Sequence, residues 1–147
     1  MRKQIKWFST AVLALALPIS TGLVLAAGEN GTSAKKERPS KVEAIEGSKV
    51  KRVTVTDKAA KRLDIQTGEV GKDADQLTTP YASILYDIGG GTWVYTVPQP
   101  LTFVRHSVVV HAIKGDKVWL KEGPAAGTKI VTVGVAELYG AEKGVGH

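Results

Sequence analysis

The sequence predicts a mainly β protein, a small β-roll or barrel-like domain with one short helix, preceded by a signal segment and a linker. The 147 residues include 16 glycines but only two phenylalanines, three tryptophans and four tyrosines. This composition favours a turn-rich β protein over a helical bundle. Short runs such as residues 129–133 alternate β-branched and polar side chains, as strands with one buried face do. Glycine- and proline-rich segments separate these runs at short intervals.

Residues 1–27 have the features of a secretory signal peptide. Three basic residues lie among the first six, and an uncharged stretch rich in Ala, Leu and Val follows and ends in small residues. We expect cleavage after Ala26 or Ala27. The alternative is an uncleaved signal anchor, since about 20 apolar residues can span a bilayer. In either case the protein is expected in the periplasm or cell envelope, close to the membrane.

The rest of the chain divides by composition into a linker and one domain. Residues 28–47 are polar with mixed charges, which predicts a disordered linker. We expect the domain to span residues 48–144. It would consist of a strand–helix–strand unit at 48–70 and a β-roll at 79–144, joined by a second short linker at 71–79.

The strand–helix–strand unit is predicted from residue type and spacing. Residues 50–56 alternate valines with polar side chains, as a half-buried strand does. Thr56 is placed to cap a short helix over 57–63, which has an acidic residue at its start and basic residues near its end. Residues 64–70 are predicted to return as a strand.

The β-roll is predicted to contain five strands, with the longest apolar run at 101–113. The strands are expected over residues 80–86, 93–97, 101–113, 118–120 and 129–133. The residues after 139 are predicted to form a glycine-rich tail. Apolar side chains on the inner faces of these strands supply the expected core, namely Trp93, Tyr95, Val108, Val110, Trp119 and Ile130.

Glycines mark two important turns. Three consecutive glycines precede the 93–97 strand, and two more flank a Pro-Ala-Ala sequence before the 129–133 strand. The triple glycine matches neither a dinucleotide-binding motif nor a Walker loop, and no helix is predicted to follow it and bind a phosphate. We therefore predict structural turns at Gly89, Gly90, Gly91, Gly123 and Gly127.

No catalytic, cofactor or metal site is predicted. The chain has no cysteine, which excludes disulfides, thiol nucleophiles and Cys-based zinc sites. His106 and His111 lie an odd number of residues apart on one predicted strand and therefore face opposite sides of it. The carboxylates of Asp87, Asp116 and Glu122 fall at predicted turns, where solvated carboxylates are common. We expect a non-enzymatic protein.

The charge distribution argues against nucleic acid as a partner. The formal net charge is +6, but three of the positive charges precede residue 28. The predicted domain is therefore close to neutral. A nucleic-acid-binding face needs clustered basic residues.

Six segments follow one another in a recognisable order. They are Pro80-Tyr-Ala-Ser-Ile-Leu, the triple-glycine turn, Trp93-Val-Tyr-Thr-Val, Phe103-Val-Arg-His-Ser-Val, Glu122-Gly-Pro-Ala-Ala-Gly-Thr-Lys-Ile-Val and Ala136-Glu-Leu-Tyr-Gly-Ala-Glu. Their order and spacing resemble the membrane-proximal domain of periplasmic adaptor subunits, also called membrane fusion proteins, of resistance-nodulation-division efflux pumps.

The resemblance implies a fold and a set of partners. In that family the domain is a small β-roll that packs against the inner-membrane transporter and stabilises the adaptor ring. The expected partners are therefore an inner-membrane efflux transporter, full-length adaptor subunits, or both. Full adaptors also carry a helical hairpin, a lipoyl-like domain and a β-barrel, for which this chain is too short.

Three hypotheses for function follow. The first is an exported, non-enzymatic adaptor-like protein that acts by protein–protein contact with an efflux system in the cell envelope. The second is a stand-alone periplasmic binding module, for an envelope polymer or a small apolar ligand, that reuses the β-roll. The third is the remnant of a split adaptor gene.

The turn at Gly127 gives a first testable prediction. The strand at 129–133 must restart two residues after Gly127, so this glycine should adopt a positive φ. The Gly127→Val variant should then lose about 1 kcal/mol or more of unfolding free energy, because valine is strained there. Thermal unfolding measures the loss, and an unchanged melting temperature would contradict the assignment.

Overall fold

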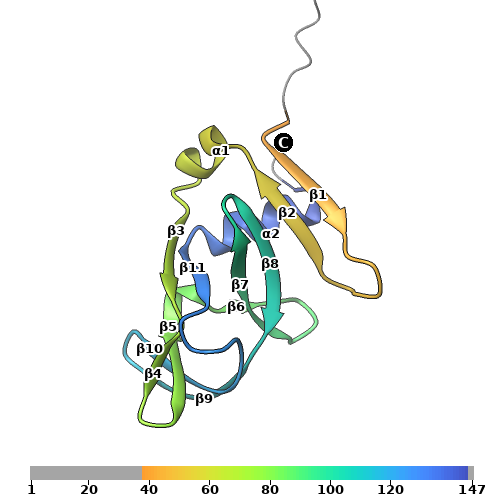
Figure 1. The fold of residues 1–147 in the computed structure, drawn as a ribbon. Helices are drawn as coiled ribbons and strands as arrows, with labels where there is room; N and C mark the ends of the chain where they lie inside the picture. The colour runs from red at the N-terminus through yellow and green to blue at the C-terminus, as the bar shows by residue number, and fades with distance from the viewer. Residues whose placement is uncertain (1–37, 146–147) are drawn as a thin grey trace, which may run out of the picture. The chain divides into compact units, whose positions relative to one another are not determined.

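The computed structural model describes residues 38–145. The predicted signal segment 1–27, with Ala26 and Ala27, and residues 28–37 of the predicted linker lie outside the described residues. The described chain forms two antiparallel sheets and two short α-helices (Figure 1). The predicted mainly β class is confirmed. Neither sheet closes on itself.

The larger sheet has seven strands and contains the centre of the fold. Its strand order is β1-β2-β8-β7-β11-β3, and β6 pairs with β7 beside this path. The bounds are β1 (Ser40–Ala44), β2 (Lys51–Val55), β3 (Gln66–Glu69), β6 (Leu85–Tyr86), β7 (Thr92–Gln99), β8 (Thr102–Ser107) and β11 (Lys129–Val133).

The smaller sheet has four strands in the order β4-β5-β10-β9. The bounds are β4 (Gly71–Asp73), β5 (Gln76–Pro80), β9 (Val109–Lys114) and β10 (Lys117–Glu122). The helices are α1 (Asp57–Arg62) and α2 (Val135–Lys143), with one 3-10 turn, η1 (Tyr81–Ser83).

The larger sheet is buried on both faces near its middle, which explains why β7 and β11 each carry adjacent apolar residues there. On one face, Tyr95 and Val131 pack with residues of α1 and α2 such as Ala59 and Leu138. On the other face, Val94 and Ile130 belong to a second cluster with residues of the smaller sheet, among them Val118 and Leu120. Adjacent residues of one strand therefore enter different cores, as side-chain alternation requires.

Helix α1 forms as the sequence predicts. The Thr56 hydroxyl accepts a hydrogen bond from the Ala59 N–H at 3.2 Å and caps the helix. Lys61 in the last turn pairs with Asp57 in the first at 2.8 Å. Ala59 is the buried residue of this helix.

Helix α2 extends into the segment after residue 139, which was predicted to be a glycine-rich tail. That prediction is wrong for residues 140–143. The helix begins after Gly134, whose φ is +86°, and ends at Lys143, which is followed by the capping Gly144 with a φ of +76°. Leu138 and Glu142 lie one turn apart and are both buried. Burial of this face offsets the low helix propensity of Gly140 inside the helix.

Both predicted linkers contain strands. β1 lies within 28–47, where alternation of Lys41, Val42 and Glu43 fits an edge strand that pairs with β2. The predicted linker 71–79 falls in a hairpin of β4 and β5, which turns at Ala74 with a φ of +51°. The polar composition concealed these strands, because threonines rather than aliphatic residues supply much of the buried surface of β5.

Two predicted strands are interrupted. In 80–86, Pro80 ends β5 and residues 81–83 form the 3-10 turn, where Ser83 Oγ donates to the Pro80 carbonyl at 2.7 Å. The later part of this run forms only the two-residue strand β6, Leu85–Tyr86. The run 101–113 breaks at Val108, where the chain leaves the larger sheet and enters the smaller one. Phe103 packs in the cluster with the helices, whereas Val108 packs in the cluster with the smaller sheet. The buried face of the chain therefore changes between these two residues.

The predicted core residues divide between the two clusters, with one exception. Tyr95, Val108 and Ile130 are buried, while Trp93 and Val110 are partly buried and pack against the clusters. Trp119 belongs to neither cluster. It is half-buried on β10, with Lys114 Nζ 5.9 Å and Lys117 Nζ 5.1 Å from its ring centroid. Its neighbours on the strand, Val118 and Leu120, are the buried residues instead.

Candidate functional site

The turn between β6 and β7, residues 87–91, presents Ile88 to solvent. Ile88 is fully exposed, with a relative accessibility of 101%. Tyr86 and Tyr81, which lie shortly before it, are 52% and 47% exposed. The short segment 81–88 thus contributes three of the large apolar side chains on the described surface. Full burial of Ile88 by a partner would contribute about 1.5–3 kcal/mol.

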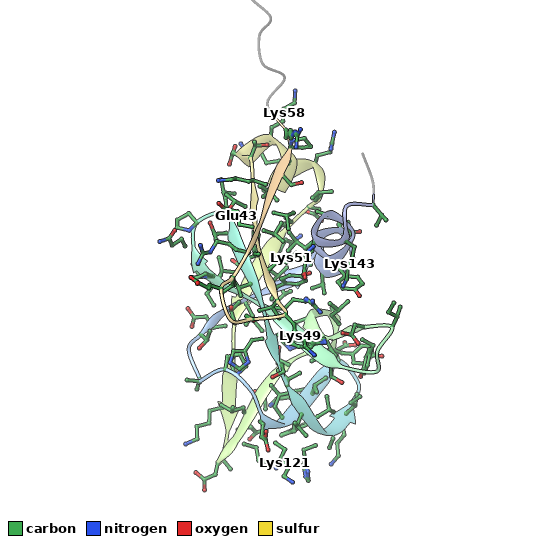
Figure 2. All side chains as sticks on the ribbon, turned by 90° about the vertical axis from the view of Figure 1, so that its right-hand side faces the viewer. Glu43, Lys49, Lys51, Lys58, Lys121 and Lys143 are labelled. Carbon is green, nitrogen blue, oxygen red and sulfur yellow. The ribbon has the colours of Figure 1, made fainter. Side chains whose placement is uncertain are left out.

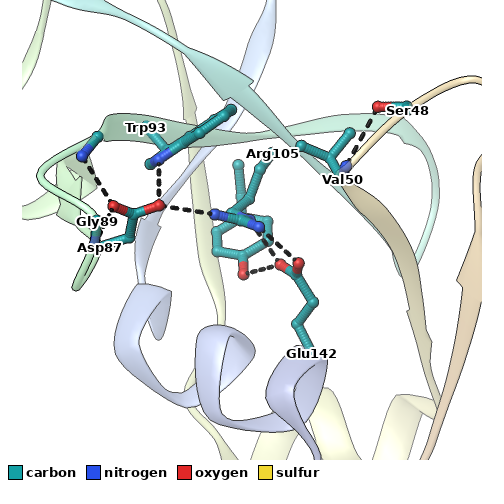
Figure 3. Close-up of polar contacts among 9 residues, drawn as sticks. Ser48, Val50, Asp87, Gly89, Trp93, Arg105 and Glu142 are labelled. Atoms are coloured by element: carbon teal, nitrogen blue, oxygen red, sulfur yellow. Dashed lines mark hydrogen bonds and ion pairs between the residues drawn. The ribbon is translucent and has the colours of Figure 1, made fainter.

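Asp87 fixes the conformation of this turn. Its Oδ1 accepts hydrogen bonds from the N–H groups of Gly89 and Gly91 at 3.0 and 2.8 Å, and its Oδ2 accepts from Trp93 Nε1 at 2.9 Å (Figure 3). The backbone closes the same turn, since Asp87 N–H donates to the Gly91 carbonyl at 3.0 Å. Asp87 is therefore a structural carboxylate, and its interpretation as a freely solvated side chain is wrong.

The glycines of this turn have separate roles. Gly90 has a φ of +79°, a conformation that disfavours other residues. A Cβ on Gly91 would lie 2.6 Å from Trp93 Nε1, so a side chain there would displace the indole from Asp87. Gly89 lies in the same turn with an ordinary φ.

These hydrogen bonds hold the pKa of Asp87 below its usual range. The largest cause is the hydrogen bond from the Gly91 N–H, followed by those from Trp93 and Gly89 and by the charge of Arg105. Partial burial opposes them. The carboxylate form of Asp87 is therefore the form that organises the turn.

Behind the turn, Arg105 on β8 and Glu142 on α2 form a buried ion pair. Arg105 Nη2 donates to Glu142 Oε1 at 2.9 Å, and Nε lies 2.8 Å from Oε2. Their side chains are 5% and 1% exposed. Arg105 Nη1 also lies 3.6 Å from Asp87 Oδ2, which links the ion pair to the turn. Figure 3 shows this chain of contacts from the turn to the helix.

Aromatic rings surround the guanidinium group. Arg105 Cζ lies 4.7 Å from the ring centroid of Trp93 and 5.5 Å from that of Tyr139. The Tyr95 hydroxyl donates to Glu142 Oε2 at 2.7 Å. Burial, followed by the hydrogen bond to Glu142, raises the pKa of Tyr95. Tyr95 therefore stays neutral and remains a donor.

This cluster connects four parts of the fold, namely the turn at 87–91, β7, β8 and α2. Each charged group in it already has a partner of opposite charge within the cluster. Among residues 38–145, no group of three or more His, Asp or Glu side chains is placed to hold a metal ion.

A small apolar groove lies on the side of the domain where α1 and α2 meet the start of β1. Its volume is about 230 Å³. The apolar lining includes Val55, Leu63, Ala141 and Val145, and charged side chains come from Arg62 and Glu137. The groove is separate from the turn at 87–91, with which it shares no residue.

The remaining residues singled out from the sequence are dispersed. Gly127 has a φ of +81°, whereas Gly123 has an ordinary φ and lies against Val108 and Leu120. His106 on β8 and His111 on β9 are exposed and belong to different sheets. Asp116 and Glu122 are exposed.

Lysines are distributed over the whole length of the domain. Figure 2 labels Lys58 at one end, Lys121 at the other, and Lys49, Lys51 and Lys143 between them. They do not form a single clustered face in this view. Among the described residues, no helix is long and apolar enough to cross a membrane.

Sequence reasoning missed the exposed Ile88 and the buried pair of Arg105 and Glu142. One available signal was Arg105 itself, which shares a strand face with Phe103 in an apolar run. A charged residue on such a face requires a buried partner. Glu142 carries the complementary signal, because it follows Leu138 by one helical turn.

Comparison of the chain with known protein families, with curated proteins and with solved structures gives no match.

The buried ion pair gives a prediction for stability. Glu142→Gln should lower the free energy of unfolding by about 3 kcal/mol, since it leaves the buried Arg105 charge without its main partner. Glu137→Gln, an exposed change on the same helix, should cost less than about 1 kcal/mol. Urea unfolding of both variants provides the comparison, and equal losses would show that the Arg105–Glu142 pair is not important for stability.

The lowered pKa of Asp87 gives a prediction for pH dependence. A carboxylate with a folded pKa below its unfolded value stabilises the fold above the unfolded pKa, and this contribution disappears as the pH falls through the folded value. The native chain should therefore exceed Asp87→Asn in unfolding free energy at about pH 6, and the difference should shrink below about pH 3. A difference that stays constant over this range would refute the role of the carboxylate.

Proposed function

We propose that this protein is an exported, non-enzymatic, adaptor-like component of the cell envelope that acts by protein–protein contact. The partner is an inner-membrane efflux transporter, full-length adaptor subunits, or both. The observation that carries the proposal is the presentation of a fully exposed Ile88 by a turn that Asp87 holds in place.

A turn of this construction suits docking for an energetic reason. Binding usually costs free energy because flexible groups must be ordered at the interface. The turn at 87–91 is already ordered by Asp87 and Trp93, so little of this cost remains. The apolar area of Ile88 and of its neighbour Tyr86 is then free to contribute to binding.

The class of partner follows from the sequence resemblance. The segments that resemble the membrane-proximal domain of periplasmic adaptors include the triple-glycine turn that follows Ile88. The Arg105–Glu142 cluster supports a non-enzymatic role, because its charges compensate one another instead of facing a substrate.

A second candidate function rests on the apolar groove between α1 and α2. Its volume of about 230 Å³ suits a small apolar molecule or one apolar side chain. On this basis the protein would be a stand-alone periplasmic module that binds a small apolar ligand. A ligand that co-purifies with the domain, with no transporter captured, would favour this function.

Crosslinking in envelope membranes tests the docking proposal. The tagged full-length chain is crosslinked and purified, and the captured proteins are identified by mass spectrometry. We expect the native chain to capture an inner-membrane efflux transporter or an adaptor subunit. Ile88→Ser should reduce this capture about tenfold, given the apolar area lost.

The matched control is Ile113→Ser. Ile113 is also an exposed isoleucine, at 46% accessibility, but lies on β9 of the smaller sheet. Its replacement should leave capture unchanged. Equal capture by the native chain and Ile88→Ser would reject the turn as the docking element, and failure of the native chain to capture either partner would reject the adaptor function.

A further inference from the structure

Strand β1 is an open edge of the larger sheet. It pairs with β2 on one side, and no strand of the described chain pairs with it on the other (Figure 1). An open edge presents backbone N–H and C=O groups that can pair with another strand. The question is which groups face outward and what strand would match them.

The hydrogen bonds to β2 identify the outward groups. The Thr56 N–H donates to the Pro39 carbonyl at 3.0 Å, so the polar backbone of residue 39 faces β2. In antiparallel pairing this orientation alternates along the strand. The backbone N–H and C=O groups of residues 41 and 43 therefore also point toward β2. Those of Ser40, Val42 and Ala44 point outward, away from β2. Pro39 removes no outward donor, since its nitrogen faces β2.

The side chains of β1 are complementary to themselves. In an antiparallel pair of two β1 strands centred on Val42, Lys41 of each copy stands opposite Glu43 of the other. Val42 stands opposite Val42, and Ser40 opposite Ala44. Opposite charges in directly facing positions stabilise a pair of strands. Figure 2 shows Glu43 on β1 among the labelled surface residues.

We propose that two copies of this chain associate through antiparallel pairing of β1 around a two-fold axis at Val42. The outward backbone groups of Ser40, Val42 and Ala44 would bond to those of the partner copy and join the two larger sheets. Val42, which is 37% exposed in one copy, would gain a partner on the sheet face that carries buried Val53. This self-association is separate from the docking proposed for Ile88.

The charge pattern selects this pairing over others. Parallel, in-register pairing of two β1 strands would bring Lys41 beside Lys41 and Glu43 beside Glu43, which is unfavourable. Within one copy Lys41 and Glu43 already pair at 2.8 Å, with side chains 73% and 41% exposed. An ion pair this exposed contributes little, so exchanging it for pairs between copies costs little.

Disulfide trapping of the full-length chain tests the proposal. The chain has no cysteine, so Val42→Cys introduces the sole thiol. In a hydrogen-bonded antiparallel pair the facing Cα atoms lie about 5.5 Å apart, a distance that a disulfide spans. Mild oxidation of envelope membranes should therefore yield a covalent dimer. Val133→Cys is the matched control, because Val133 is 38% exposed but lies on β11.

Charge reversal tests the register. Adding Lys41→Glu to Val42→Cys should reduce the trapped dimer about tenfold, because it places like charges opposite each other at two positions. Adding Glu43→Lys as well should restore the dimer, since the reversed pattern is again complementary. Mixing the Lys41→Glu and Glu43→Lys chains, each with Val42→Cys, should give a heterodimer.

Several results would overturn the proposal. These are absence of a Val42→Cys dimer, equal trapping at Val133, or a dimer that ignores the charge reversals. A Val42→Cys adduct with a different protein would show that another partner occupies this edge. None of these results would bear on capture through Ile88, which is measured separately.

Discussion

The ion pair between Arg105 and Glu142 is the constraint on which much of this fold depends. Both side chains are almost completely buried, and an unpaired charge in that position would cost several kcal/mol. Helix α2 must therefore present Glu142 to β8. The same requirement fixes the position of Leu138, one turn earlier in the helix, against the core. Through Asp87 and Trp93 the constraint extends from the helix to the turn that carries Ile88.

A second constraint is the burial of the larger sheet on both faces. Strands β7 and β11 supply residues to both apolar clusters, so they have few positions that tolerate polar side chains. The outer strand β1 has no such restriction and can carry Lys41 and Glu43. The two proposed interaction sites thus lie where the packing requirement is weakest, at a turn and at an edge.

The sequence was sufficient to predict the fold class, the capped helix α1 and the strand at 129–133. These features depend on local signals, namely side-chain alternation, a capping threonine and glycine turns. It was not sufficient where the structure depends on contacts between distant segments. The break at Val108 exists because the chain moves to another sheet, and the β4–β5 hairpin is buried through threonines whose environment only the tertiary fold defines. The ion pair joins residues far apart in the sequence, and only the fold brings them together.

The groove beside α1 and α2 has a further consequence for how the domain is connected. Pro39, near the start of the described chain, and Val145, at its end, line the same groove. The two ends of the domain therefore lie near each other, as in domains that tolerate insertion into a host protein. A host loop could enter and leave the domain at this one place without unfolding it. The hairpins β4–β5 and β9–β10 contribute no residue to the groove, so a host protein joined at the groove would not cover them there.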